Sequence, residues 1–185
     1  MTTIEKIKKI IKTILAIWGA ISLVGLFALA GYLYYSLGPG NKTVDDRASN
    51  NDVRFVLNWC RLGDHRIEKV LHSHISARSF SGDHLDAYSI KIKNIKIDEL
   101  TNKTDTIGGR WYRGDMLPKI LSDALTSVCA WQHKTPWFPK ESEIRSSDFY
   151  IYPWSIHCQG ILPSGAQIIL VNPEEKIVYY ISTES

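Results

Sequence analysis

Residues 14–37 read ILAIWGAISLVGLFALAGYLYYSL, and they form the centre of a longer run, 13–41, that contains no charged residue. As a helix, these 24 residues would be about 36 Å long. The hydrocarbon layer of a membrane is about 30 Å thick, and a helix can cross it because every backbone N–H and C=O is paired within one segment. The sequence therefore predicts a transmembrane signal-anchor helix over residues 13–37.

The charges on either side of this span predict its orientation. Four lysines precede it (Lys6, Lys8, Lys9 and Lys12) with one acid, whereas the 18 basic and 18 acidic residues that follow it cancel. A short basic flank stays in the cytoplasm. Residues 1–12 are therefore predicted to be a cytoplasmic tail of an inner (plasma) membrane protein, with the rest of the chain exported. Because the exported part is neutral, the formal net charge of +3 does not indicate nucleic acid as a partner.

A cleaved signal peptide is the alternative interpretation of the same segment. Ala28-Leu29-Ala30 fits an A-x-A cleavage site. The apolar run, however, continues to Tyr35 and is longer than the apolar region of about 7–15 residues that such peptides carry. The uncleaved anchor is favoured and cleavage after Ala30 stays open; both interpretations export the same domain.

The rest of the chain divides into a linker and one domain. Residues 38–52 begin with the helix-breaking GPGN and continue as a polar run without apolar periodicity, which is typical of a linker. Residues 53–185 are enough for one globular domain with its own core. Their pattern predicts an α+β fold, with a mostly antiparallel sheet and about two helices on one face, in the order α-β-β-α-β-β-β.

The clearest element of the domain is a predicted helix over 116–131, with Asp115 as its N-cap. Its apolar residues recur at three- and four-residue spacing: Leu117, Ile120, Leu121, Ala124, Leu125 and Val128. A shorter helix is predicted over 53–62. The predicted strands are 70–80, 85–92, 149–158, 167–171 and 177–181.

The first two strands are predicted to form a hairpin that turns at residues 81–84. The register that collects the apolar residues on one buried face pairs Ile75 with Ile90 and Ala77 with Tyr88. It pairs His74 with Lys91 and His72 with Lys93 on the other, solvent-facing side. That side then carries a locally basic set: His72, His74, Arg78, Lys91 and Lys93.

The candidate metal ligands are His72, His74, His84 and Asp86. A zinc ion needs three or four such ligands to converge. In the predicted register two lysines lie beside His72 and His74 and would repel a cation, so a solvated polar face is favoured and no metal or other cofactor is predicted. The alternative is a membrane-anchored hydrolase or metalloenzyme that uses some of six residues: His72, His74, His84, Asp83, Asp86 and His157.

Three cysteines, Cys60, Cys129 and Cys158, lie in the part of the chain that is predicted to be exported. In an oxidising compartment a pair of cysteines tends to form a disulfide. Cys129 lies at the end of the long predicted helix, and Cys158 lies at the end of a strand expected beneath it. A Cys129–Cys158 disulfide is therefore predicted.

Most of the aromatic residues in and before the predicted strand 149–158 are expected in the core, and three of them are candidates for a contact surface. Tyr150, Tyr152 and Trp154 alternate along one predicted strand and share one of its sides, where they are candidates for a docking surface together with the basic set. No catalytic motif stands out. The sequence therefore favours a non-enzymatic binding module, either an assembly subunit or an inhibitor or immunity-type protein. It would be held in the membrane by residues 13–37 and would bind a protein partner.

Overall fold

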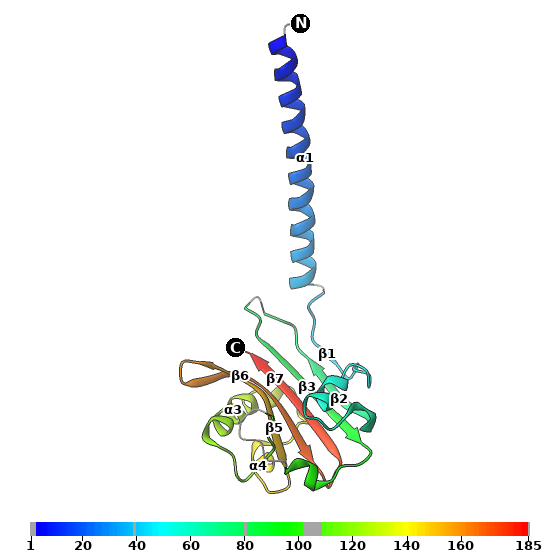
Figure 1. Ribbon diagram of the computed structural model, residues 1–185, viewed down its shortest axis with the longest axis vertical. Helices are drawn as coiled ribbons and strands as arrows, with labels where there is room; N and C mark the ends of the chain where they lie inside the picture. Colours follow the sequence, from blue (N-terminus) through cyan, green and yellow to red (C-terminus); the bar gives the residue numbers. More distant parts are fainter. Residues whose placement is uncertain (1–2, 39, 80, 102–108, 185) are drawn as a thin grey trace. The chain divides into compact units, whose positions relative to one another are not determined.

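The computed structural model of this protein describes residues 3–38, 40–79, 81–101 and 109–184 (Figure 1). The chain divides into two compact units, Met1–Lys42 and Thr43–Ser185. The first unit is helix α1 (Thr3–Leu37). Its part Lys9–Ser36 is long and apolar enough to cross a membrane, and none of it is buried. This length and composition fit a membrane anchor and a signal sequence alike.

The second unit is built on an antiparallel sheet in which the described residues form seven strands, in the order β1-β2-β3-β7-β6-β5-β4. The strands are β1 (Val44–Asp45), β2 (Ile67–Ile75), β3 (His84–Ile92), β4 (Tyr112–Arg113), β5 (Tyr150–Gln159), β6 (Leu162–Asn172) and β7 (Ile177–Glu184). The predicted α+β class, with a mostly antiparallel sheet, is confirmed. The C-terminal strand β7 lies near the middle of this sheet and joins the β2–β3 hairpin to β6 and β5 (Figure 1).

Helices cover both faces of the sheet, so the prediction that they lie on one face is wrong. The α-helices of this unit are α2 (Arg54–Trp59), α3 (Lys119–Cys129) and α4 (Glu141–Ile144), and its 3₁₀ helices are η1 (Asp64–Arg66), η2 (Ile97–Leu100) and η3 (Gln132–Lys134). The reason is visible in β6, where the four consecutive residues 168–171 are all fully buried. Successive side chains of a strand point to opposite faces. Both faces are therefore apolar, and each needs a cover.

Each face has its own core, which we name after the helix that covers it. On the α2 face, Val56 and Leu57 pack with sheet residues that include Tyr88, Ile169 and Tyr180. On the α3 face, the helix packs with sheet residues that include Ile151, Ile168, Leu170, Tyr179 and Ile181. The apolar stripe predicted for α3 is confirmed in part, since its members Leu121, Ala124, Leu125 and Val128 are fully buried while Ile120 is 41% exposed.

Helix α3 is shorter than predicted, because it begins after Pro118 and not at Met116. A proline disfavours the helical conformation in the residue before it, so the helix does not extend back through Leu117. Asp115 is therefore not the N-cap. Its carboxylate instead binds the guanidinium of Arg113, with Nε 2.6 Å from Oδ1.

The predicted register of the β2–β3 hairpin is wrong by four residues, since Ile75 pairs with Asp86 and not with Ile90. The connection is longer than predicted, because residues 76–83 separate the two strands, and β2 contains two irregularities in its register. The new register pairs His74 with Ala87, and His74 is buried, contrary to the prediction. Tyr88 and Ile90 are buried as predicted, and His72 and Lys93 are exposed as predicted.

Candidate functional site

The structure separates the four candidate metal ligands. The ring of His72 stacks on Trp137 with centroids 5.3 Å apart, and His74 Nδ1 lies 2.6 Å from Asp45 Oδ1. Asp86 is paired with Arg78 through two hydrogen bonds, of 3.1 and 2.6 Å. Among the described residues, no group of three or more His, Cys, Asp and Glu side chains is placed to hold a metal ion.

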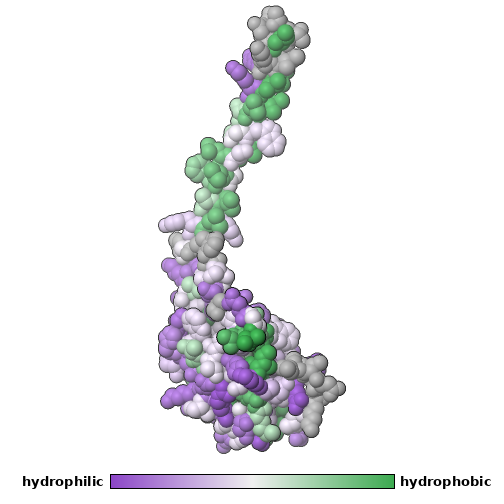
Figure 2. Space-filling view, turned by 90° about the vertical axis from the view of Figure 1, so that its left-hand side faces the viewer, coloured by the Kyte–Doolittle hydropathy of each residue, from purple (hydrophilic) through white to green (hydrophobic). Residues whose placement is uncertain are grey.

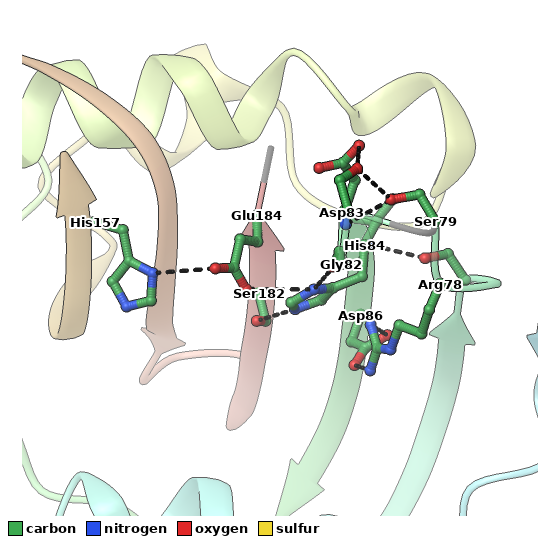
Figure 3. A network of polar contacts seen from close by, with 12 residues as sticks. Arg78, Ser79, Gly82, Asp83, His84, Asp86, His157, Ser182 and Glu184 are labelled. Atoms are coloured by element: carbon green, nitrogen blue, oxygen red, sulfur yellow. Dashed lines mark hydrogen bonds and ion pairs between the residues drawn. The ribbon is translucent and has the colours of Figure 1, made fainter. Parts of the chain in front are cut away.

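His84 and His157 lie on either side of Glu184 across one end of the sheet (Figure 3). Each histidine Nδ1 is 3.9 Å from a Glu184 carboxylate oxygen, which is too long for a hydrogen bond. Both ring nitrogens of His84 already have closer partners, since Nδ1 is 3.0 Å from Gly82 O and Nε2 is 3.0 Å from Ser182 Oγ. His84 is therefore held in place by the strand ends around it.

The Ser182–His84 contact has the residue types of a nucleophile and its base, but it lacks the access that catalysis needs. Ser182 is 3% exposed and lies within β7 between Asp86 of β3 and Gln167 of β6. A nucleophile must meet substrate and a set of oxyanion donors. The backbone around Ser182 is instead paired with a neighbouring strand on each side. Asp83 also has a structural role, because it accepts a hydrogen bond from Ser81 Oγ at 2.9 Å within the β2–β3 loop.

All three cysteines lie in the described part of the chain and are free thiols, so the predicted Cys129–Cys158 disulfide is not formed. Cys129 is buried in the α3-face core, and Cys158 is exposed on the β5–β6 hairpin. Burial raises the pKa of the Cys60 and Cys129 thiols to about 12. Both are therefore protonated and unreactive at neutral pH.

The predicted aromatic surface is divided between core and solvent. Tyr152 is 3% exposed and belongs to the α2-face core, Tyr150 is half-buried, and Trp154 is 43% exposed. Trp154 stacks on Trp59 with ring centroids 4.7 Å apart and planes within 4°. An irregularity in β5 between Pro153 and Ser155 accompanies this change in exposure. Of the three predicted residues, Trp154 alone offers a large exposed area.

The predicted basic set is also dispersed. Arg78 is paired with Asp86, and Lys91 Nζ donates to the backbone oxygen of Glu175 at 2.6 Å. Lys93 Nζ lies 3.4 Å from His65 O at the opposite end of β3 from Arg78. These contacts anchor loops and strand ends, so the set does not form one basic surface.

A cavity that the sequence did not predict lies at the other end of the sheet from His84. We call it the Glu175 cavity. It has a volume of about 580 Å³ and is lined by three segments and Tyr179: Pro136, Trp137, Phe138, Pro139 and Lys140 after η3; Glu143, Ser146, Asp148 and Phe149 from α4 to β5; and Asn172 and Glu175 at the β6–β7 turn. The cavity thus joins parts of the chain that are distant in sequence.

The charges around the Glu175 cavity are mainly negative. Glu143, Asp148 and Glu175 line it with a single basic residue, Lys140. Within the described ranges, none of the three carboxylates takes part in an ion pair. Two of them accept local hydrogen bonds: Glu143 Oε2 from the Lys140 backbone N–H at 2.9 Å, and Asp148 Oδ1 from Ser147 Oγ at 3.2 Å. Such a rim attracts a positively charged group.

Aromatic side chains also line the Glu175 cavity. Tyr179 is 8% exposed, and burial, together with the charges of Glu175 and Glu143, raises its pKa to about 12. Its hydroxyl is therefore neutral at physiological pH. No hydrogen-bond partner for that hydroxyl lies among the residues that the structure describes. Trp137 is half-buried and meets Phe138 edge-on, with centroids 6.0 Å apart. Aromatic rings beside carboxylates are the combination that binds cationic groups.

Local sequence patterns gave little indication of this cavity. Most of its residues come from the segments between the predicted helix 116–131 and the predicted strand 149–158, and between the predicted strands 167–171 and 177–181. The one available signal is Trp137-Phe138 between two prolines, because large aromatic residues in a connecting segment must pack against something.

The fold and the site define a small α+β domain with an aromatic, acidic cavity, on a chain that also carries a long apolar helix. Comparisons of this chain with known protein families, with curated proteins and with solved structures found no match.

Proposed function

We propose that this protein is a single-pass membrane protein whose exported domain is a non-enzymatic binding module. The Glu175 cavity is its binding site, and it takes a basic side chain of a protein partner. The observation that carries this proposal is the combination of the largely buried aromatic side chain of Tyr179 and the carboxylates of Glu143 and Glu175 around one cavity. Both an assembly subunit and an inhibitor or immunity-type protein would use such a site.

Reversible binding fits the cavity better than catalysis. Its described lining contains neither histidine nor cysteine, and the hydroxyl of its one serine, Ser146, accepts a hydrogen bond from the Asp148 backbone N–H and is bonded to no carboxylate among those lining residues. A nucleophile without a base is a weak catalyst. The hydrolase or metalloenzyme alternative needs three of the His and Asp candidates to converge, and no observation in the described residues favours it.

The membrane part of the proposal rests on the N-terminal segment. Four lysines precede an uncharged apolar run that forms a helix without buried residues, which supports an anchor with a cytoplasmic N-terminus. Mass spectrometry of the protein from its host would distinguish an intact chain from one that begins at Gly31. A reporter fused after Ser185 should be active only in the exported compartment, and cytoplasmic activity would contradict the proposed orientation.

The binding site can be tested with a small cation and its neutral isostere. The full chain in detergent micelles would be titrated with n-butylguanidinium, and separately with n-butylurea, while the tryptophan indole N–H resonances are followed by NMR. We expect the Trp137 resonance, assigned with Trp137→Phe, to shift with the cation and to shift much less with the urea.

Two adjacent acids provide a matched control. Glu175 lines the cavity, whereas Glu174 does not, and both are exposed. Glu175→Gln should weaken the binding of butylguanidinium about threefold, the effect of losing one solvent-exposed ion pair, and Glu174→Gln should leave it unchanged. Equal shifts with the cation and the urea, or equal effects of the two substitutions, would refute a cationic site.

A further inference from the structure

The β5–β6 hairpin ends in a small apolar tip. Gln159 pairs with Leu162, so the turn consists of Gly160, at φ +68°, and Ile161. Ile161 is 95% exposed and Leu162 is 65% exposed, the latter next to Pro163. Figure 2 shows hydrophobic residues gathered on the side of the domain where this hairpin lies in Figure 1. We refer to residues 158–163, which carry no charged side chain, as the hairpin tip.

The composition of the tip is unusual for a turn. Two-residue hairpin turns favour Gly, Asn and Asp, and Gly160 alone satisfies the positive φ that this turn needs. Ile161 adds nothing to either core of the domain, because nearly all of its surface faces solvent. Adjacent exposed aliphatic residues at a projecting turn are explained by a contact outside the domain.

The register of the sheet places the tip at the same end as the start of the domain. Thr43 Oγ1 accepts a hydrogen bond from Ala77 N–H at 3.2 Å, at the end of the sheet where β3 begins with His84. His84 pairs with Glu184, and Gly165 pairs with both Glu184 and His157. The β5–β6 hairpin continues past His157 by three to four residues, which is about 10 Å at 3.3 Å per residue.

A short connection joins this end of the sheet to the apolar helix. Residues 38–42 lie between helix α1 and Thr43, and a fully extended chain of that length spans about 20 Å. If the helix is anchored in a bilayer, the connection keeps the tip at a high effective concentration beside the lipid surface. Two aliphatic side chains then suffice for a contact that would be too weak between free molecules.

We infer that the hairpin tip enters the headgroup region of the bilayer that anchors the chain, with Ile161 and Leu162 as the inserted side chains. The inference rests on the membrane anchor of the proposed function. Insertion to the interfacial depth of about 5–10 Å fits the projection of the tip beyond Glu184. At this depth the Glu184 carboxylate stays in water. The side chain of Asp86, which is paired with Arg78 farther along the sheet, stays in water as well. Because the tip carries no charge, its insertion desolvates no ion.

The native thiol of Cys158 makes the test direct, because Cys60 and Cys129 are buried. The full chain would be reconstituted into phosphatidylcholine vesicles, labelled at Cys158 with the fluorophore NBD, and quenched with nitroxide-labelled lipid. The control carries the label at Glu174→Cys in a Cys158→Ser background, on the β6–β7 turn at the opposite end of the sheet. We expect at least about twofold stronger quenching at position 158 than at position 174.

A tip variant and a flotation assay distinguish failure of the tip insertion from failure of the membrane anchor. Ile161→Ser combined with Leu162→Ser should reduce the quenching at Cys158 to the level of the control, with circular dichroism unchanged. Equal quenching at positions 158 and 174 would overturn the inference and leave the anchor intact. A blue-shifted label at Cys158 without lipid quenching would indicate a protein contact and would also overturn it. If the full chain did not float with the vesicles, the anchor and the inference would both fail.

Discussion

The two ends of the sheet present different surfaces on one scaffold. At the end that carries Thr43, an uncharged apolar tip projects beyond the polar row of His84, Glu184 and His157 (Figure 3). At the opposite end, aromatic side chains line a cavity whose charged lining residues are mainly acidic and include Glu175. We call these the Thr43 end and the Glu175 end. An apolar projection suits a lipid surface, whereas an acidic concavity suits a cation.

The strand connections account for this difference. Strands β5 and β6 are joined by a two-residue turn and extend together beyond their neighbours, so their tip has no cover. Strands β6 and β7 are joined by a longer loop, residues 173–176, in which Asn172 Oδ1 accepts a hydrogen bond from Glu175 N–H at 3.1 Å. The segment from Pro136 to Phe149 packs beside that loop and closes the cavity. One sheet therefore carries an uncovered tip at one end and a cavity at the other.

The largest expected difference is in the reactivity of the three thiols. A pKa of about 12 for Cys60 and Cys129 lowers the thiolate fraction about 10³-fold relative to an ordinary thiol of pKa about 8.5, and burial limits access further. A water-soluble alkylating reagent should therefore modify Cys158 in the native protein in detergent, and the other two only after denaturation. Peptide mass spectrometry would measure this, and rapid modification of Cys129 would show that the α3-face core is open.

A truncation in the α3-face core should destabilise the domain that carries both ends. Leu125 is fully buried on α3, so Leu125→Ala should lower the free energy of unfolding by about 2–5 kcal/mol. Ile120→Ala, on the same helix at a position that is 41% exposed, is the control and should cost less than about 1 kcal/mol. Denaturant unfolding would measure both. Equal losses would mean that α3 does not pack on the sheet through the predicted stripe.

Sequence periodicity was sufficient to predict the main elements of the fold. The stripe of α3 and the alternating strands recur over enough residues to be recognised from local pattern alone. The hairpin register was predicted incorrectly, because the predicted register buries only one face of the hairpin, whereas both faces are buried. Ala87 and Tyr88 are neighbours that point to opposite faces, and both are buried. When both faces are apolar, the alternation that specifies a register is lost.

The candidate site was less predictable than the fold. Residues near in sequence, such as His72 and His74, share a strand face, yet one is exposed and stacked on Trp137 while the other is buried beside Asp45. The Glu175 cavity instead depends on the strand order, which places the β6–β7 turn beside the segment before β5. That order is a long-range property of the sheet, and no local pattern contains it.

Alanine substitutions of one glycine at each end test how closely the backbones pack there. At the Glu175 end, a Cβ on Gly114 would overlap the backbone oxygen of Ile144. At the Thr43 end, a Cβ on Gly165 would lie 2.5 Å from the backbone oxygen of Thr183. Neither backbone group can move away as a flexible side chain would. Gly114→Ala should therefore cost about 3 kcal/mol and Gly165→Ala about 2 kcal/mol.

Thermal and denaturant unfolding of the two glycine variants would measure these costs. Gly25→Ala, at a position in α1 with nothing within 4 Å, is the control and should not destabilise the domain. A variant as stable as the wild type at either glycine would show that the backbones at that end are farther apart than described here.

The smallest predicted effect concerns the ion pair that joins α4, beside the cavity, to α3. Burial acts to raise the pKa of Glu141, but hydrogen bonds from Thr126 and Arg145 outweigh it and lower that pKa. Arg145 Nη2 lies 2.7 Å from Glu141 Oε1, and Arg145 Nη1 donates to Ser122 Oγ of α3 at 2.9 Å. A carboxyl whose pKa is lowered by folding stabilises the native state above its unfolded pKa of about 4.3. This contribution is lost as the pH falls through the lower, folded value.

Glu141→Gln should therefore lower the free energy of unfolding at pH 7 by at most about 1 kcal/mol, because the pair is partly exposed and screened by solvent. The difference from the wild type should shrink as the pH falls below about 4.3, and urea unfolding at several pH values would measure it. Glu174→Gln, at an exposed position that the structure places in no ion pair among the described residues, is the control and should show no such trend. A difference for Glu141→Gln that is constant with pH would mean that its carboxylate charge does not hold α4 against α3. The cavity wall at the Glu175 end would then depend on apolar packing through Ile144, which is fully buried in the α3-face core.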